Sequence, residues 1–230
     1  MVSPGMKRYR TRTDNQARLV GDRGGEPLDF PALFGRRAQI RLEIGFGHGE
    51  FISQMAAAHP HEDFVGVDID DLRTTKAAHK SNRLDAANVR VFNDEAHRFV
   101  RFRIPPASVQ RCYILFPDPW PKPSHRRRRL MNRTFLLDVA WALAPGGRLI
   151  IASDTHNYAF QALWNCTTLP HLWLNRYSSG FRFDIPTRFP TVFERYKKEE
   201  GCSICYLMLE RTATSAPERV AWPPRVTNRE

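Results

Sequence analysis

Short apolar runs alternate with segments of helical periodicity through the middle of this 230-residue chain. The runs that predict buried strands are residues 40–44, 64–67, 89–92, 110–116 and 148–152, and residues 204–209 predict a late strand antiparallel to its neighbours. Helical patterns follow most of these runs, after Gly49 through Met55 to Ala58 and over residues 72–84, 96–102 and 134–143. Repeated alternation of this length predicts a mostly parallel, doubly wound α/β sheet.

The pattern over residues 134–143 has one apolar face at helical spacing. Its members are Phe135, Leu136, Val139, Ala140 and Leu143. The segment 144–147, which reads Ala-Pro-Gly-Gly, ends this helix because proline and glycine both interrupt helical structure. We therefore expect the next strand to begin at Arg148.

The two ends of the chain lack this alternation. Residues 1–35 are polar and rich in glycine and arginine, which is typical of a basic arm that becomes ordered on binding. Residues 212–230 have no periodicity and are expected to form a disordered tail. Because a chain of this length supports one sizeable core, residues 36–211 are expected to form a single domain.

Composition narrows the function classes. The 35 Lys and Arg residues outnumber the 24 Asp and Glu residues, for a net charge of +11. Such an excess favours a polyanionic partner, with nucleic acid ahead of an anionic membrane surface. Four scattered cysteines predict neither a disulfide framework nor a metal site. No apolar run has the length of a membrane span and residues 1–7 lack a signal-peptide apolar region, so we expect a cytoplasmic protein with no membrane partner.

A glycine-rich loop follows the first predicted strand. Glu43 lies near the end of that strand, and Gly45, Gly47 and Gly49 alternate after it. Glycines let a backbone approach a ligand closely and turn tightly into a helix. This spacing differs from that of pyrophosphate-binding dinucleotide folds, and the acid would repel a pyrophosphate. A carboxylate here suits a cationic ligand such as the amino and sulfonium groups of S-adenosylmethionine.

Two further acids stand at the ends of the next strands. Asp68 is placed to accept hydrogen bonds from the vicinal hydroxyls of a ribose. Asp94 could reach the exocyclic amine of an adenine. Each acid alone is equally well explained as a helix cap. Together with Glu43, they give three acids at three successive strand ends of one sheet, which predicts a nucleoside pocket.

The most informative segment follows the strand at 110–116. It reads Phe116-Pro117-Asp118-Pro119-Trp120-Pro121-Lys122. Its prolines exclude both strand and regular helix, so a stiff loop must present a carboxylate, an indole and an ammonium where open α/β sheets bind ligands.

The basic run Arg126 to Arg129 comes a few residues later. Such a run alone is as consistent with a solvated surface as with nucleic-acid binding, but beside this loop it indicates a grip on phosphates. Trp120 could pack under the loop or stack on a base.

These motifs occur in an order that resembles one known family. The loop from Glu43 to Gly49, the Phe-Pro-Asp-Pro-Trp block with its basic run, the segment 144–147, Ser153-Asp154 and the segment 191–194 together resemble the bacterial tRNA (guanine-N(7)-)-methyltransferases of the TrmB family. The resemblance covers about residues 7–210. It departs from the family at Asp68, where a glutamate is usual, at Val192, where a lysine is usual, and after Glu194.

The resemblance implies a class I S-adenosylmethionine-dependent methyltransferase fold, with a mostly parallel seven-stranded sheet and helices on both faces. It implies tRNA as partner, 7-methylguanosine in the variable region as product, and no obligatory protein partner. Cofactor or catalytic positions would be Glu43, Gly45, Gly47, Gly49, Asp68, Asp94 and Asp118. Substrate contacts would come from Lys122, Asp154, Thr191, Val192, Phe193 and Glu194, and tRNA phosphate contacts from Arg126, Arg127, Arg128 and Arg129.

The expected chemistry needs no strong base. Ring nitrogen seven of guanine carries a free lone pair, so catalysis would rest on positioning and electrostatics, with Asp118 offsetting the charge formed on the ring.

Two alternatives remain open. A methyltransferase acting on an amino group would use a similar loop but needs acceptors around both amine hydrogens. A non-catalytic RNA-binding subunit would be expected to have lost some of the acids, and cofactor binding distinguishes it.

Overall fold

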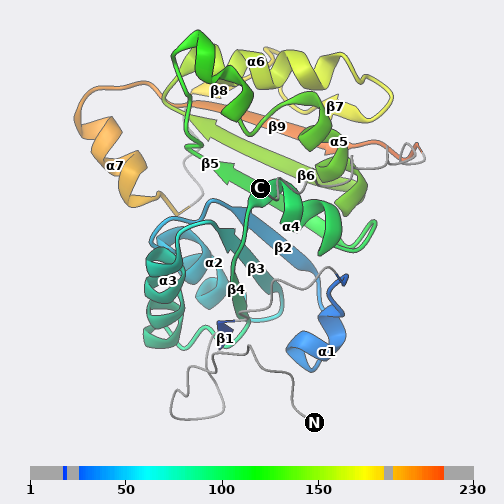
Figure 1. Ribbon diagram of the computed structural model, residues 1–230, viewed down its shortest axis with the longest axis vertical. Helices are drawn as coiled ribbons and strands as arrows, with labels where there is room; N and C mark the ends of the chain where they lie inside the picture. Colours follow the sequence, from blue (N-terminus) through cyan, green and yellow to red (C-terminus); the bar gives the residue numbers. More distant parts are fainter. Residues whose placement is uncertain (1–17, 20–25, 184–188, 215–230) are drawn as a thin grey trace, which may run out of the picture.

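The computed structural model describes residues 18–19, 26–183 and 189–214, which form a mixed sheet with helices on both faces (Figure 1). The strands are β1 (Arg18–Leu19), β2 (Ile40–Ile44), β3 (Asp63–Asp68), β4 (Val89–Asn93), β5 (Val109–Leu115), β6 (Leu143–Ser153), β7 (Trp173–Asn175), β8 (Arg182–Phe183) and β9 (Cys205–Arg211). The helices are α1 (Phe30–Phe34), α2 (Glu50–Ala58), α3 (Asp71–Arg83), α4 (Ala96–Phe102), α5 (Arg133–Ala142), α6 (His156–Thr167) and α7 (Val192–Glu199), with the 3-10 helix η1 (Pro123–Arg128). Over the described ranges, no helix is long and apolar enough to cross a membrane.

Strand order places a ligand crevice at the centre of the sheet. The order is β1-β4-β3-β2-β5-β6-β9-β7, and β8 also pairs with β9. Pairs among β1 to β6 are parallel, whereas β9 is antiparallel to β6, β7 and β8. The chain runs outward from β2 to β4 and then returns to place β5 on the other side of β2. Such a reversal opens a crevice at the carboxyl ends of β2 and β5, where sheets of this kind bind ligands.

The mostly parallel sheet expected from the sequence is confirmed, and so is the late antiparallel strand. Nine strands are present in the described residues instead of seven, because the two-residue strands β1 and β8 add to the sheet. Strand β6 begins at Leu143 and not at Arg148, since a shift in its register with β5 accommodates residues 144–147. A proline-glycine segment can therefore continue a strand as an irregularity after it has ended a helix.

Two apolar layers hold the helices on the sheet. Helices α1, α4, α5 and α6 pack on one face, and α2 and α3 on the other. The helical face predicted from residue 135 to residue 143 is buried as expected, with every member at most 2% exposed. Burying a side chain such as Phe135 or Leu136 stabilises the fold by about 1.5–3 kcal/mol. The crevice therefore rests on a rigid, doubly covered sheet.

Part of the expected N-terminal arm belongs to this core. Leu28 and Phe30 are buried, and the backbone N–H of Leu28 donates to the carbonyl of Arg103 at 2.8 Å. Asp29 caps α1 by accepting from Ala32 N, and the helix ends at a left-handed glycine. The folded region thus begins before residue 36. The rest of the expected arm, apart from β1, and the tail from residue 215 lie outside the described residues.

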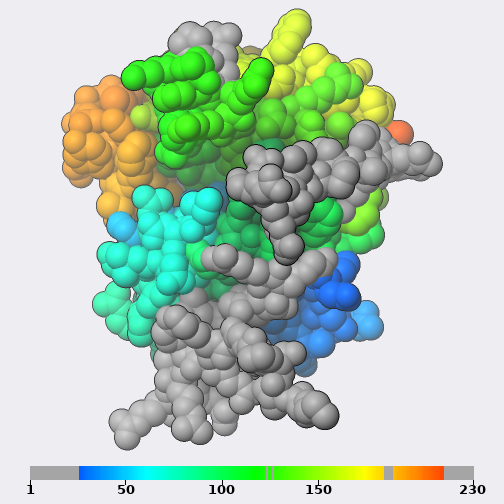
Figure 2. Space-filling model, viewed as in Figure 1, coloured from blue at the N-terminus to red at the C-terminus, as the bar shows by residue number. Residues whose placement is uncertain are grey.

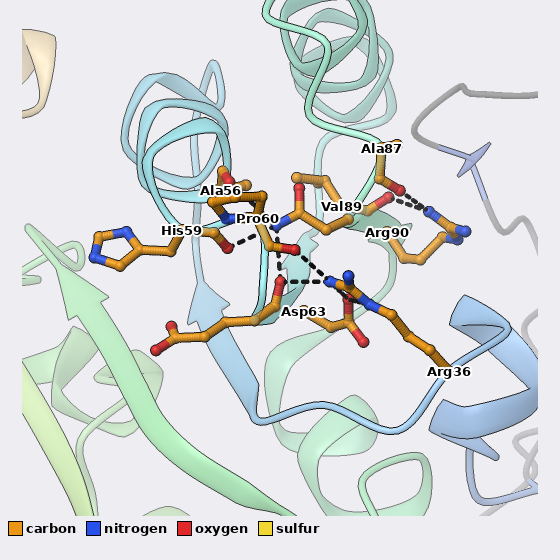
Figure 3. A network of polar contacts seen from close by, with 10 residues as sticks. Arg36, Ala56, His59, Pro60, Asp63, Ala87, Val89 and Arg90 are labelled. Carbon is orange, nitrogen blue, oxygen red and sulfur yellow. Dashed lines mark hydrogen bonds and ion pairs between the residues drawn. The ribbon is translucent and has the colours of Figure 1, made fainter.

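A polar network fixes the edge of the sheet where the strands begin (Figure 3). The Arg36 guanidinium donates to the carbonyl of Pro60 at 2.8 Å and to the carboxylate of Asp63 at 2.6 Å. The side-chain amide of Asn88 donates to the carbonyl of Ala56 near the end of α2 at 3.1 Å, and to two carbonyls of the turn between α2 and β3. This network holds the ends of the strands that lie away from the crevice.

Candidate active site

The glycine-rich loop turns over the carboxyl end of β3. All three of its glycines have positive φ, and the N–H of Gly45 donates to the carbonyl of Val67 at 2.8 Å. At Gly49 a β-carbon would lie 2.4 Å from the Cβ of Ala77 on α3. A side chain is therefore excluded there, and α2 can begin in close contact with α3. The loop consequently runs close over the strand ends as bare backbone, as the sequence predicted.

Asp68 holds this loop in place. Its Oδ2 accepts from Gly47 N and its Oδ1 from Asp70 N, each at 3.0 Å, and the residue is only 5% exposed. The sequence assigned Asp68 to a ribose diol, and the structure gives the carboxylate a second task in joining the glycine loop to the start of α3. Carboxylate oxygens accept more than one hydrogen bond each, so both tasks are compatible.

Asp94 follows β4 directly beside Asp68, whose carbonyl accepts from Asp94 N at 3.1 Å. Its Oδ1 accepts from Glu95 N at 2.8 Å and from Arg98 Nε at 3.0 Å. Its Oδ2 is buried and has no hydrogen-bond partner within the described residues. A buried acceptor left unpaired costs about 1–3 kcal/mol, so the position is suited to a ligand that brings its own donor. The exocyclic amine of an adenine is such a donor.

Glu43 lies in β2 at the reversal point of the sheet. It is 3% exposed, and its Cα partners are Gly66 on β3 and Tyr113 on β5. Two residues later the chain enters the glycine loop. An acidic side chain at this point of the sheet, just before the glycine loop, suits a cationic ligand.

The Pro-Asp-Pro-Trp loop leaves β5 next to the glycine loop, because β2 and β5 are adjacent and parallel. Phe116 and Trp120 have φ values of 56° and 42°, in the left-handed region that costs residues with side chains about 1–3 kcal/mol. Between these two bends, Asp118 is exposed at the surface of the loop, and Lys122 is exposed beyond it. The loop with its two strained bends thus leaves a carboxylate and an ammonium exposed at the carboxyl end of β5.

Arg129 supports this loop through hydrogen bonds to its backbone carbonyls. Its Nε donates to the carbonyl of Pro119 at 2.8 Å and its Nη2 to that of Trp120 at 3.3 Å. A third bond reaches Gln161 on α6, and the guanidinium lies over the Tyr158 ring at 5.4 Å. Burial raises the pKa of the Tyr158 hydroxyl, and the nearby Asp118 carboxylate adds to this effect. Arg129 therefore joins the loop to α6.

The structure separates Arg129 from the other arginines of the basic run. Arg127 and Arg128 are exposed on η1, whereas the side chain of Arg126 lies outside the described residues. Arg128 lies over the Trp120 ring at 4.9 Å, and His125 meets the edge of the same ring at 5.6 Å. Trp120 thus packs within its own loop. Sequence reasoning missed the bracing role of Arg129, because that role depends on carbonyls nine and ten residues away.

Helix α7 stands beside the same loop. In Figure 1 the arrowheads of β5 and β6 point toward the side on which α7 lies, and Figure 2 shows α7 (orange) on the flank of the molecule. The Phe193 ring contacts Phe116, with centroids 5.1 Å apart. Phe193 and Val192 are exposed, so both are available to a substrate. Thr191 caps the helix by accepting from Glu194 N at 3.0 Å.

Glu194 faces the sheet instead of the solvent. It is 1% exposed, accepts from the Tyr206 hydroxyl on β9, and pairs with Lys198 at 3.3 Å. Its carboxylate therefore anchors α7 to β9, and its contact with the substrate stays a prediction. Near it, the Lys197 ammonium lies 3.9 Å from Asp154 at the end of β6. A hydrogen bond with Glu200 holds the pKa of Lys197 above its usual value.

Lys197 is a cation that sequence reasoning missed. The family resemblance drew attention to the position of Val192, where a lysine is usual, and not to the next turn of the helix. The 3.9 Å separation from Asp154 and the position of the ammonium over the Phe193 ring at 5.5 Å place Lys197 at the same edge of the crevice. The sequence spacing could have identified Lys197, because it lies four residues after Phe193 and residues four apart lie on one helical face.

Comparison with known proteins agrees with this geometry. Residues 37–179 match a family model described as "Putative methyltransferase". A tRNA (guanine-N(7)-)-methyltransferase of Methylococcus capsulatus is 37% identical over 189 residues, which cover 80% of this chain and 80% of that protein. The chain belongs to the tRNA (guanine-N(7)-)-methyltransferase family.

Other members of this family differ more in length. The Thermotoga maritima protein is 33% identical over 194 residues, covering 84% of this chain and 61% of that protein. The Bordetella parapertussis protein is 42% identical over 137 residues, covering 60% of this chain and 54% of that protein. The matched region thus spans little more than half the length of these two relatives.

Solved structures establish the fold class. The 16S rRNA methyltransferase KamB superposes with a TM-score of 0.55 at 18% identity, covering 85% of this chain and 99% of that one. A 16S rRNA (adenine(1408)-N(1))-methyltransferase from Catenulisporales acidiphilia, solved with cosubstrate SAM, superposes with a TM-score of 0.56 at 15% identity, covering 81% of this chain and 91% of that one. The expected class I S-adenosylmethionine-dependent methyltransferase fold is confirmed.

Proposed function

We propose that this protein uses S-adenosylmethionine to methylate N7 of a guanine in the variable region of tRNA, in the bacterial cytoplasm. The observation that carries the proposal is the position of the Pro-Asp-Pro-Trp loop, which leaves β5 directly beside the glycine loop of β2. Membership in the tRNA (guanine-N(7)-)-methyltransferase family supports the same reaction.

The cofactor half of the crevice would use the acids at the strand ends. Asp94 Oδ2 would accept from the adenine amine, Asp68 from the ribose hydroxyls, and the backbone of Gly45 to Gly49 would lie against the rest of the molecule. Glu43 would attract its positive charge. These residues fit S-adenosylmethionine because Asp94 Oδ2 is a buried acceptor that lacks a partner in the described residues.

The chemical step asks little of the protein. Bound S-adenosylmethionine would supply an electrophilic methyl group on a sulfonium. The guanine N7 lone pair would form the new carbon–nitrogen bond as the carbon–sulfur bond broke, and no proton would have to be removed first. Asp118 would orient the base and offset the positive charge that develops on the ring. Groups that meet such charge in a pre-formed site typically contribute a factor of about 10²–10³ in rate.

The tRNA side of the site would be electropositive. Lys122 would hold a phosphate or the acceptor edge of the guanine, and Arg127 and Arg128 would contact phosphates from η1. Phe193 and Val192 would contact the nucleotide from α7, with Lys197 and Asp154 between the helix and the end of β6. The Lys197 ammonium could supply the cation that is absent at Val192.

Product analysis tests the proposal. Unmodified tRNA transcripts are incubated with the protein and isotopically labelled S-adenosylmethionine, digested to nucleosides and analysed by mass spectrometry. We expect labelled 7-methylguanosine that maps to the variable region. Label in an amino-methylated adenosine or cytidine would favour an amino-group methyltransferase, and RNA binding with neither label transfer nor S-adenosylhomocysteine binding would favour a non-catalytic RNA-binding subunit.

A further inference from the structure

A cluster of rings lies outside the proposed active site, where α6 meets β8. His156, Phe160, Phe181 and Phe183 form a closed circuit of ring contacts, with neighbouring centroids 5.2 to 6.4 Å apart. Trp164 stands one helical turn after Phe160, on the same face of α6. We call these five residues the α6–β8 aromatic patch. It is assembled from α6 and from residues 181–183, which β7 separates in the sequence, and the fold brings them together.

Much of this patch faces solvent. Phe160 is 40% exposed, Phe183 49% and Trp164 70%. Phe181 packs partly against the core and supports the others. Leaving a large ring in water forgoes the stabilisation that its burial would contribute. The exposed rings are thus not explained by packing, and contiguous exposed apolar surface of this kind marks a binding site.

Strand register places the patch at the crevice edge of the sheet. Phe183 on β8 pairs with Cys205 on β9, and Cys205 pairs with Ser153 at the end of β6. Asp154 follows Ser153 directly, and His156 begins α6 just after it. The patch therefore begins at the same strand end as the proposed substrate contacts, on the side of β6 away from β5.

Exposed arginines lie beside the helix that carries two of the rings. Arg129 reaches Gln161 on α6, so the preceding η1, with the exposed Arg127 and Arg128, lies beside α6. Arg182 does not belong to the patch, because its guanidinium lies over Tyr177 in the apolar layer of the other face of the sheet. Exposed rings next to guanidinium groups, in a protein of net charge +11, have the chemistry that binds single-stranded nucleic acid.

We propose that the α6–β8 aromatic patch stacks against one or more unpaired bases of the RNA substrate, next to the nucleotide that is methylated. The identity of that RNA rests on the proposed function, whereas the stacking itself rests on the geometry of the patch. A second copy of this chain is the less suitable occupant, because the cores of interfaces between subunits are depleted of charged residues and the exposed Arg127 and Arg128 stand beside α6.

The test compares tRNA affinity among three variants of the full chain. Trp164→Ala and Phe160→Ala each remove an exposed ring, and Phe102→Ala is the matched control. Phe102 is 39% exposed but ends α4, which runs toward the opposite edge of the sheet. Loss of stacking on one base should weaken binding of the unmodified transcript by roughly 5- to 100-fold in each patch variant. The salt dependence of binding should keep its slope, because no phosphate contact is lost.

The aromatic replacement Trp164→Phe should restore most of the affinity, and S-adenosylhomocysteine should bind every variant as it binds the wild type. Wild-type affinity in both patch variants would overturn the proposal, as would a concentration-dependent dimer that the patch substitutions dissociate. Methylation by the wild-type protein is measured on the same transcript. Its absence contradicts the proposed function, whereas methylation combined with unchanged affinity in the variants overturns the stacking surface alone.

Discussion

Asp94 and Asp118 differ in how much of each carboxylate the protein itself uses. Asp94 has one oxygen that accepts from Glu95 N and Arg98, while the other is buried without a partner in the described residues. Asp118 is exposed on a strained loop. The first arrangement suits a fixed contact to a cofactor that stays in place during the reaction. The second suits a group that must meet a base delivered by a large RNA.

Asp94→Asn tests the cofactor contact at this scale. The amide of an asparagine can take two orientations, and each places its N–H₂ group against another donor. In one orientation that donor is the adenine amine, and in the other it is the Arg98 guanidinium with Glu95 N. We expect S-adenosylhomocysteine binding to weaken by about 1–3 kcal/mol by calorimetry. Asp71→Asn removes the same charge from an exposed position on α3 and should leave the affinity unchanged. Equal affinities in the two variants would contradict the assignment of Asp94.

At the level of helices and strands, contacts between neighbouring elements hold the loops and helices that border the crevice. The close approach of Gly49 to Ala77 sets α2 against α3, and the Glu194–Tyr206 contact sets α7 against β9. In each case one buried contact fixes an element that borders the crevice. Changes at these contacts should therefore affect stability or substrate binding without altering any group that touches the reacting atoms.

Gly49→Ala should be costly for two separable reasons. Its φ of 74° strains any side chain, and its new Cβ would overlap Ala77, whereas Gly201 has a φ of 77° with open space around it. We expect a loss in the free energy of unfolding of about 1 kcal/mol for Gly201→Ala and about 2–4 kcal/mol for Gly49→Ala, measured by urea denaturation. Ala77→Gly should couple favourably to Gly49→Ala in a double-mutant cycle. Additive effects of the two changes would refute the steric explanation.

Tyr206→Phe should loosen α7 by removing the hydroxyl that donates to the buried Glu194 carboxylate. We expect the KM for tRNA to rise while S-adenosylhomocysteine affinity stays constant, because α7 borders the substrate side of the crevice. Lys198→Ala removes the partly exposed partner of the same carboxylate and should matter less, since exposed ion pairs contribute about 0–1 kcal/mol. A larger rise of the KM for tRNA in Lys198→Ala than in Tyr206→Phe would contradict the idea that the buried hydrogen bond is what holds α7 in place.

Elements and contacts differ in how far the sequence could predict them. The runs at 40–44 and 89–92 coincide with β2 and most of β4, because a strand covered on both faces reads as a nearly continuous apolar segment. Helix α1 was missed although Asp29, Pro31 and Gly35 carry start and stop signals. The Arg129 brace and the Glu194–Tyr206 contact could not be predicted, since each joins groups that only the tertiary fold brings together.

At the scale of the whole molecule, the positive charge and the crevice belong to one surface. Exposed Arg127 and Arg128 stand on η1, which leads out of the Pro-Asp-Pro-Trp loop and lies against α6. The strands that end at the crevice bring the glycine loop, the exposed carboxylate of Asp118 and helix α7 to the same side. A bound tRNA would therefore be drawn toward the edge where the methyl group is transferred.

Replacing Arg127 and Arg128 together by alanine should weaken tRNA binding and reduce the slope of log affinity against log salt by about one unit for each lost phosphate contact. The matched control replaces Arg37 and Arg83, which are equally exposed but lie near the edge where the strands begin. Filter binding across a salt series measures both slopes. Identical slopes in the two double variants would show that Arg127 and Arg128 are solvated surface residues that do not contact phosphates.

The role of the loop after β5 in methyl transfer can be tested by the single-turnover rate of Asp118→Asn. Asparagine keeps the size of the side chain but removes the charge that would offset the cationic ring. With enzyme in excess over tRNA and saturating S-adenosylmethionine, the rate of 7-methylguanosine formation should fall by about 10²–10³, while S-adenosylhomocysteine and tRNA affinities fall far less. Formation of 7-methylguanosine at the wild-type rate would show that Asp118 is structural and contradict the account of this loop.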